Sequence, residues 1–202
     1  HNADIHELAA KVPPAKDARL TELARRVARD QVTRDPASSG RRSAGVPALA
    51  QGPGSALLLT RMVSIDCDNT AWLQRQLREV GWFDIPSYGA AADKDAWLLV
   101  QHADRTPEFQ TEVLALLRSL EPGRTDRRNL AYLEDRVATA EQRPQRYGTQ
   151  GQCSPEGRWS PRPIEDPEGV DARRAALGMP PMAEYEKLFA GLCPKVSSTA
   201  LP

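Results

Sequence analysis

The N-terminal part of the chain carries an apolar pattern with the spacing of a helix face. Four apolar residues recur at intervals of three and four positions, namely Leu20, Leu23, Ala24 and Val27. This period predicts an amphipathic helix over residues 15–35. Past Val27 the same face continues as three polar side chains, Asp30, Gln31 and Arg34. An apolar stripe therefore becomes polar within one predicted helix.

Similar patterns predict further helices downstream. A helix over about 68–80 has an apolar side made of Trp72, Leu73, Leu77 and Val80, which it shares with Asn69 and Gln76. Gly81 is a natural C-terminal stop for it. Thr106 and Pro107 predict the start of another helix, with the hydroxyl capping a free N–H. Thr125 is expected to cap a helix that carries Leu130, Leu133 and Val137. Short helices are expected near 171–176 and 181–189.

The segment from Asp93 to Ala103 contains the run AWLLV, which is apolar on every side. A surface helix would not tolerate this run, whereas a central helix would. We expect a buried core helix here, and a strand is the alternative, because short apolar runs do not distinguish the two. Gln101 and Asp104 extend the side of Trp97 and Val100, so this helix also changes from apolar to polar.

Pro- and Gly-rich stretches separate or follow these helices. Residues 36–57 have no periodicity and are expected to form a flexible insertion. After Pro144 the chain becomes rich in Gly and Pro, and the residues from Ser154 to Gly157 suit the turn of a small hairpin. The predicted fold is mainly α: one helical bundle over 15–190 with a buried central helix, between tails at 1–14 and 191–202.

Composition narrows the classes of partner and compartment. The 202 residues are 40% hydrophobic and 27% charged, which is typical of a folded soluble domain. Acidic and basic residues balance at 27 each, so nucleic acid is an unexpected partner. No apolar run is long enough to cross a bilayer, so no membrane association is expected, and the pattern leaves the oligomeric state open.

Three cysteines, Cys67, Cys153 and Cys193, have no metal-binding spacing, and an odd number cannot pair completely. Reduced thiols in a cytoplasmic protein are the simplest interpretation. The alternative is a secreted mature form with a disulfide between Cys153 and Cys193. Neither Cys67 nor Ser154 lies in a sequence motif of a catalytic nucleophile.

Polar residues on faces that should be buried are the candidates for chemistry, because an unpaired buried polar group costs about 1 to 3 kcal/mol. His102 lies between Gln101 and Asp104, and its side chain suits proton transfer near neutral pH. A neutral core histidine within a structural hydrogen-bond network is the alternative. A metal site on His102 and Asp104, or an all-oxygen site on Asp30, Asp104 and Asp135, is a weaker hypothesis, since a second well-placed histidine is missing.

Several short motifs together resemble a known family. The block QHAD ends at Asp104, the block AYLEDR contains Tyr132, Asp135 and Arg136, and the block YGTQ contains Tyr147, Thr149 and Gln150. Gln110 lies between the first two blocks, and the segment Asp30–Arg34 precedes all three. The order of these motifs is similar to that in the bacterial family catalogued as domain of unknown function 6624, over about residues 20–188. The family name carries no activity, so the resemblance implies a shared fold and a shared polar centre.

The resemblance changes one interpretation made from periodicity. Asp135, Arg136 and Tyr132 face away from the predicted apolar stripe of their helix, which alone predicts exposure to solvent. If the family motifs mark one site, then Asp135, Arg136, Tyr147 and Gln150 join His102 there.

Two functions are consistent with these residues. The first is an enzyme without a cofactor that acts on a small polar or anionic molecule. In it, His102 is the general acid or base, Asp104 or Asp135 orients it, and Arg136 or Arg34 binds an anionic group. The second is a non-catalytic binding or interaction module. Its recognition network would consist of amides, those of Gln31, Gln101, Gln110 and Gln150.

Overall fold

A computed structural model describes residues 18–34 and 53–193 of the chain. The mainly α class is confirmed. The helices before the C-terminal segment are α2 (Ala18–Arg34), α3 (Pro53–Val80), α4 (Ile85–Tyr88), α5 (Ala90–Gln101), α6 (Pro107–Ser119) and α7 (Arg127–Ala140). The C-terminal segment contains β1 (Gly151–Cys153), β2 (Trp159–Pro161), a 3-10 turn (Pro167–Gly169), α8 (Val170–Ala175) and α9 (Met182–Lys187).

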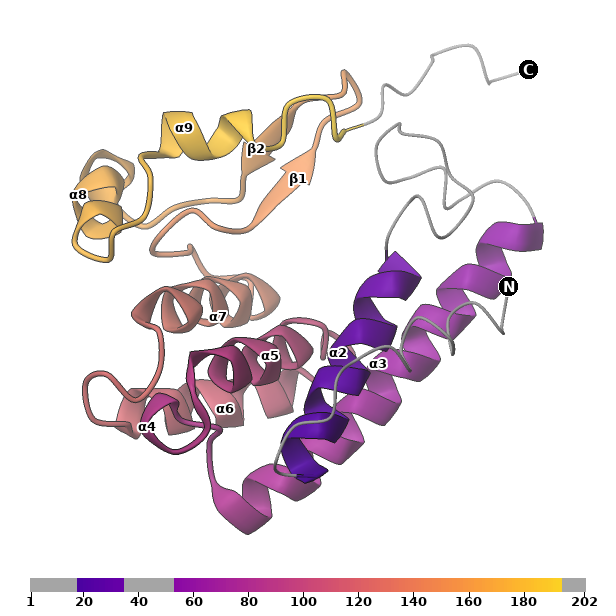
Figure 1. Cartoon of the computed structure of the whole chain (residues 1–202). Coiled ribbons are helices and arrows are strands. Elements are labelled where there is room, and N and C mark those ends of the chain that lie inside the picture. The colour runs from indigo at the N-terminus through magenta and orange to yellow at the C-terminus, as the bar shows by residue number, and fades with distance from the viewer. Residues whose placement is uncertain (1–17, 35–52, 194–202) are drawn as a thin grey trace.

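Helix α5 is the centre of the helical part (Figure 1). It contacts α2 and α3 on one side and α6 and α7 on the other. Its residues Ala96, Leu99 and Val100 are buried, which confirms the expected central helix and removes the strand alternative. The β1–β2 hairpin, α8 and α9 form a layer on the far side of α7 from α5 (Figure 1). Helix α7 is therefore covered on two sides.

The core is divided between these layers. The main cluster joins side chains from α2, α3, α5, α6 and α7 with Phe83 of the α3–α4 connection, and it includes Leu23, Leu73, Leu99 and Leu133. A smaller cluster holds the C-terminal layer together around Val170, Met182 and Tyr185. Here the ring of Trp159 stacks on that of Phe189 with their centroids 4.4 Å apart. Within the hairpin, a Cβ on Gly151 would come within 2.0 Å of the Trp159 ring, so the ring can lie against this position only because the residue is glycine.

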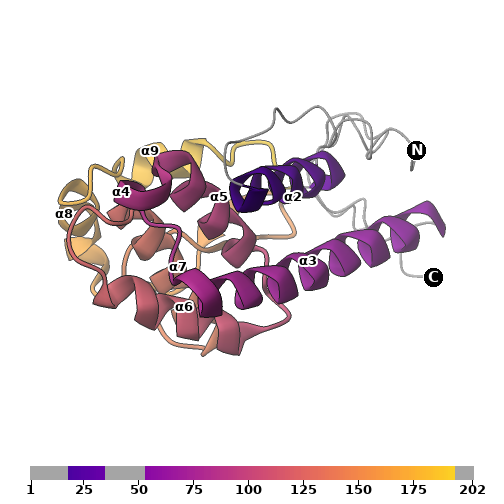
Figure 2. The ribbon, with the colours of Figure 1, turned by 60° about the horizontal axis from the view of Figure 1, so that its bottom comes forward.

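Helix α3 is much longer than predicted. It begins at Pro53 instead of about Asp68 and projects as one continuous rod (Figure 2). The predicted flexible insertion at 36–57 is wrong for its last five residues, and residues 35–52 lie outside the described part of the chain, as does the predicted tail 1–14. Leu57 and Leu59 are exposed. Because these two apolar side chains are not buried, hydrophobic periodicity did not reveal this end of the helix.

Helix ends were predicted better than their caps. Helix α2 confirms the first predicted helix, and Gly81 ends α3 with a positive φ of 72°. The Thr106 hydroxyl makes no capping bond at α6, contrary to expectation. Helix α7 is capped by the Asp126 carboxylate, which accepts from the Arg128 N–H, and not by Thr125. Helix α4 has no counterpart among the predicted elements.

The C-terminal segment contains the expected hairpin. Strands β1 and β2 pair antiparallel, and the N–H of Ser154 donates to the Arg158 carbonyl across the turn at 2.7 Å. A disulfide joins Cys153 to Cys193, so reduced thiols are the wrong interpretation for this pair, while Cys67 is free and exposed. Residues 191–193 of the predicted C-terminal tail belong to the described structure, in which Cys193 is buried, and residues 194–202 lie outside the described part of the chain. None of the helices in the described ranges is both long and apolar enough to cross a membrane.

A buried carboxylate on α5 holds α5 and α7 in register. One oxygen of Asp93 accepts from the Trp82 indole N–H at 2.7 Å. The other accepts from the backbone N–H of Asp126 and from the Asn129 amide, both at 3.1 Å. Asp93 thereby joins the end of the α3–α4 connection to the first turn of α7. Two residues further along α5, burial raises the pKa of Asp95, whose carboxylate accepts no hydrogen bond from the described residues.

We expect Asp93→Asn to lower the free energy of unfolding by about 1 to 3 kcal/mol, because the new NH2 group would face N–H donors at one of the two oxygen positions. Chemical denaturation monitored by circular dichroism measures the change. The matched control is Asp95→Asn on the same helix.

Asp95→Asn should stabilise the protein slightly at neutral pH. Because the folded-state pKa of Asp95 is raised, its charged form disfavours folding, and this cost disappears as the carboxyl is protonated. The advantage of the variant should therefore shrink as the pH falls toward about 3. If the gain in stability of Asp95→Asn is the same at every pH in this range, the raised pKa of Asp95 is contradicted.

Candidate functional site

His102 is held against a buried carboxylate from another helix. It is the first residue after α5, and its backbone N–H donates to the Leu99 carbonyl at 3.2 Å. Its ring atom Nδ1 lies 2.9 Å from Oδ2 and 3.0 Å from Oδ1 of Asp30 on α2. The Asp30 side chain is fully buried, and 21% of the His102 side chain is exposed. Asp30 is therefore the carboxylate that orients this imidazole.

Asp30 accepts hydrogen bonds from two more side chains, Arg34 and Gln31. Arg34, one turn later on α2, donates to Oδ1 of Asp30 and also to Oδ1 of Asp66 on α3, the latter at 2.7 Å. The amide of Gln31 donates to Oδ2 of Asp30 at 2.8 Å. Two carboxylates, one guanidinium and one imidazole from three helices thus form a continuous chain, which we call the His102 cluster: Asp66, Arg34, Asp30 and His102.

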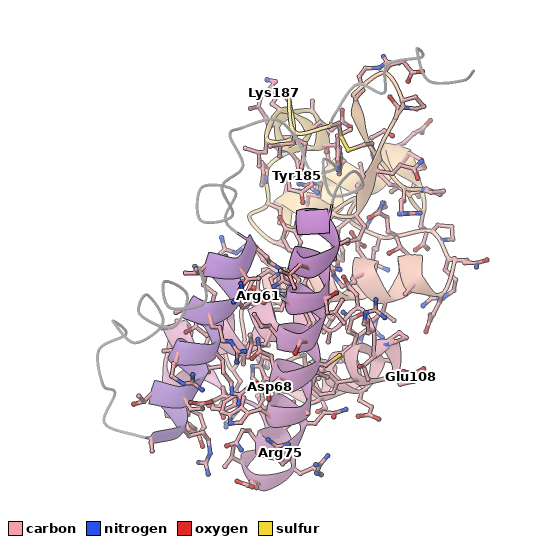
Figure 3. The ribbon with its side chains drawn as sticks, turned by 90° about the vertical axis from the view of Figure 1, so that its right-hand side faces the viewer. Arg61, Asp68, Arg75, Glu108, Tyr185 and Lys187 are labelled. Carbon is pink, nitrogen blue, oxygen red and sulfur yellow. A yellow bond between two sulfur atoms is a disulfide. The ribbon has the colours of Figure 1, made fainter. Side chains whose placement is uncertain are left out.

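Polar contacts also position α2 against α3, which lie side by side (Figure 3). Arg19 donates to Gln76 at 2.7 Å, and Arg26 donates to Asp68 at 3.0 Å. With the Arg34–Asp66 bond, these arginines contact α3 at three points between Asp66 and Gln76. Of the polar residues that follow Val27 in α2, Arg34 bonds to α3, whereas Gln31 bonds to Asp30, and Asp30 also bonds to Arg34 and His102. The His102 cluster lies at one end of this interface.

Asp66 was missed in the sequence analysis. Burial raises the pKa of its carboxyl, and the bond from Arg34 acts in the opposite direction. Asp66 lies three residues before Asn69 and seven before Leu73, both of which are buried, so all three share one helix face. A prediction that extended α3 toward its N-terminus would have placed Asp66 on that face.

Three groups of the His102 cluster could ligate a metal ion. Ligand atoms of Asp30, Asp66 and His102 lie within 4.8 Å of one another. The structure does not bring together the sets expected from sequence, since Asp104 and Asp135 have other partners. Arg34 donates to both carboxylates, so the positive charge that these groups require is supplied by the protein itself.

A second polar group surrounds Asp104. Its Oδ1 accepts from Arg136 on α7 at 2.7 Å and from the Gln110 amide on α6 at 3.2 Å. The Nε of Arg136 also donates to Oε1 of Gln101 at 3.1 Å. Arg136 therefore contacts the residue that precedes His102. We call Gln101, Asp104, Gln110 and Arg136 the Arg136 cluster.

Asp135 belongs to neither cluster. Its two oxygens accept from the backbone N–H groups of Arg146, Tyr147 and Thr149 and from the Thr149 hydroxyl, at 2.7 to 3.2 Å. Burial raises the pKa of this carboxyl, while these donors act to lower it. The exposure predicted from periodicity is wrong, because the C-terminal layer covers this face of α7. Asp135 holds the YGTQ loop.

Tyr132 joins α7 to the C-terminal layer, because its ring packs edge-on against Tyr185 of that layer as well as against Trp97 of α5. The Gln150 amide bonds within the YGTQ loop, where it donates to the Thr149 hydroxyl at 3.1 Å. Sequence analysis missed two residues here. Gln145 bonds to the backbone of Gln150 and Arg162. Arg174, fully buried, donates to the Tyr147 carbonyl at 2.6 Å, and burial lowers its pKa.

The comparisons with known proteins agree with the resemblance seen in the sequence. Residues 34–193 match the profile of a family described as "Family of unknown function (DUF6624)". No curated protein and no solved structure matches the chain. The match spans the Arg136 cluster, Asp135 and most of the His102 cluster, while Asp30 lies four residues before its start.

We expect Asp135→Asn to lower the free energy of unfolding by about 2 to 3 kcal/mol, because an NH2 group would face the N–H donors of the loop. Hydrogen exchange at Arg146, Tyr147 and Thr149 should accelerate.

Glu134→Gln is the matched control on the same helix. It weakens only an exposed ion pair with Arg118, which should cost less than about 1 kcal/mol. Equal effects of the two substitutions would contradict the structural role of Asp135.

Proposed function

The chain belongs to the family of unknown function DUF6624, and from its polar clusters we propose that it is an enzyme acting on a small polar molecule, with His102 as general acid or base. The contact between His102 Nδ1 and the buried Asp30 carboxylate is the observation that carries the proposal.

This contact suits proton transfer for a simple reason. A carboxylate beside Nδ1 favours the tautomer with the proton on that atom, which leaves a lone pair on Nε2 for a substrate proton. When the ring takes up a proton, the negative charge of Asp30 stabilises the resulting cation. Such a group contributes about 10² to 10⁴ in rate in known enzymes. The reaction would be of a hydrolase, lyase or cyclase type.

The surroundings assign different roles to the two arginines considered for anion binding. Arg34 already neutralises Asp30 and Asp66, so it is better suited to hold Asp30 in place. Arg136 has one partly exposed carboxylate partner and lies beside the residue preceding His102. We therefore assign substrate binding to Arg136 and positioning to Arg34.

A non-catalytic binding module is the second candidate, and the Arg136 cluster favours it. One amide and one guanidinium contact Asp104, a second amide contacts that guanidinium, and amides cannot transfer protons. In this case His102 would be a structural partner of Asp30. Turnover that depends on His102 separates the two candidates.

The disulfide favours an oxidising compartment over the cytoplasm. We therefore propose the secreted alternative rather than the cytoplasmic location that the thiol count first suggested.

The test uses a panel of small esters, amides and phosphoesters, and compares the protein with His102→Gln and Asp30→Asn. His102→Gln should lower kcat/KM by about 10² to 10⁴, and Asp30→Asn should lower kcat more than it raises KM. The control is Asp68→Asn, which removes a half-exposed carboxylate from α3 that pairs with Arg26.

Nitrogen NMR of the imidazole provides a readout that needs no substrate. We expect the neutral ring to carry its proton on Nδ1, and Asp30→Asn should change the tautomer population. Turnover that persists unchanged in His102→Gln, or a ring protonated on Nε2 instead, would reject the enzymatic proposal.

A further inference from the structure

We propose that Arg136, Gln110 and Gln101 form a binding site for the carboxylate or phosphate group of a small molecule, and that the side chain of Asp104 occupies this site in the free protein.

The geometry around Asp104 is that of a carboxylate receptor. Its Oδ1 accepts from Arg136 at 2.7 Å and from Gln110 at 3.2 Å. Gln110 is only 1% exposed. Its side-chain amide also donates to the Val100 carbonyl at 3.0 Å, and this second bond fixes the direction of the amide. A buried donor and a guanidinium are thus aimed at one carboxylate oxygen.

Arg136 is itself fixed in direction. Its Nε donates to Oε1 of Gln101, and a guanidinium restrained in this way presents its remaining N–H groups at defined angles. The planar fork of an arginine matches the oxygens of carboxylates and phosphates. Only 25% of this side chain is exposed, so the group is partly desolvated before any ligand arrives.

Gln101 provides an independent indication of a missing partner. Its Nε2 is buried and has no hydrogen-bond acceptor among the described residues. This nitrogen lies on the same amide whose oxygen accepts from Arg136. Asp104 makes no hydrogen bond to this nitrogen. In the proposed site, the acceptor atom of a ligand bound to Arg136 is its partner.

Asp104 is suited to being displaced. It lies in the turn between α5 and α6, and 64% of its side chain is exposed. Exposed ion pairs contribute little to stability, because the free carboxylate is well solvated. A ligand oxygen in its place would accept the same two hydrogen bonds. Asp104 therefore acts as an internal competitor, and removing its charge should strengthen binding.

The site stands beside the proposed proton-transfer group, since Gln101 and His102 are consecutive at the end of α5. That the bound group belongs to a substrate rests on the proposed function, whereas anion binding by the Arg136 cluster does not.

The experiment measures dissociation constants for inorganic phosphate and for succinate by NMR titration of the backbone amides at constant ionic strength. Asp104→Asn should bind the preferred anion about tenfold more tightly than the unmodified protein, and Arg136→Gln should bind it at least about tenfold more weakly. Gln101→Met, which removes the unpartnered donor and keeps the volume, should also weaken binding. The two probes show whether the site prefers phosphate or carboxylate.

The Arg118–Glu134 ion pair between α6 and α7 provides matched controls. Its atoms are 2.6 Å apart and exposed, and Glu134→Gln and Arg118→Gln change the net charge in the same way as the test variants. Both controls should leave the dissociation constants within about twofold.

The proposal is overturned if Asp104→Asn tightens binding no more than Glu134→Gln does, or if folded Arg136→Gln binds as well as the unmodified protein. If Arg136→Gln does not fold, Arg136→Lys replaces it in the measurement. Binding by Arg136→Lys as tight as that of the unmodified protein would overturn the role given to the planar guanidinium. His102→Gln separates this inference from the enzymatic proposal, because it should lose turnover and keep phosphate or succinate binding. Anion binding without turnover would reject only the enzymatic proposal. Turnover that depends on His102 but occurs without anion binding would reject only the anion site.

Discussion

A carboxylate removed from water must find donors within the protein, and the described structure is organised around three such groups. Asp30, Asp93 and Asp135 are each at most 1% exposed, and each receives hydrogen bonds from a different segment of the chain. Asp30 connects α2 to the end of α5, Asp93 connects α5 to the start of α7, and Asp135 connects α7 to the YGTQ loop. The apolar core fills the space between segments whose relative positions these carboxylates fix.

The donors distinguish the three groups. Asp93 and Asp135 receive hydrogen bonds from backbone N–H groups and from neutral side chains, which exchange no protons near neutral pH. Asp30 instead receives them from an imidazole and a guanidinium. Asp30 also accepts from the neutral Gln31 amide, so what distinguishes it from the other two carboxylates is its contact with ionisable side chains. This difference is the basis of the proposal for His102.

The polar change after Val27 correctly predicted a buried polar side chain at Asp30, because helical spacing alone places both on one face. Spacing failed for Asp135, since α7 has two buried sides and a single-stripe pattern assumes one. It failed for Asp66, since Leu57 and Leu59 near the start of α3 are exposed and gave no sign of a helix that far upstream. The partners of Asp30 and Asp104 come from helices distant in sequence, and nothing local encodes which carboxylate reaches the imidazole.

The disulfide between Cys153 and Cys193 closes a loop of the chain that contains α8 and α9, and the two cysteines are 40 positions apart. Cross-linking a segment of this length lowers the entropy of the unfolded chain, an effect on the order of 4 kcal/mol. The C-terminal layer has only a small apolar cluster of its own. Under reducing conditions the layer would be retained by non-covalent contacts, among them those of Asp135, Gln145 and Arg174. The redox state of the surroundings therefore affects how firmly this layer covers α7.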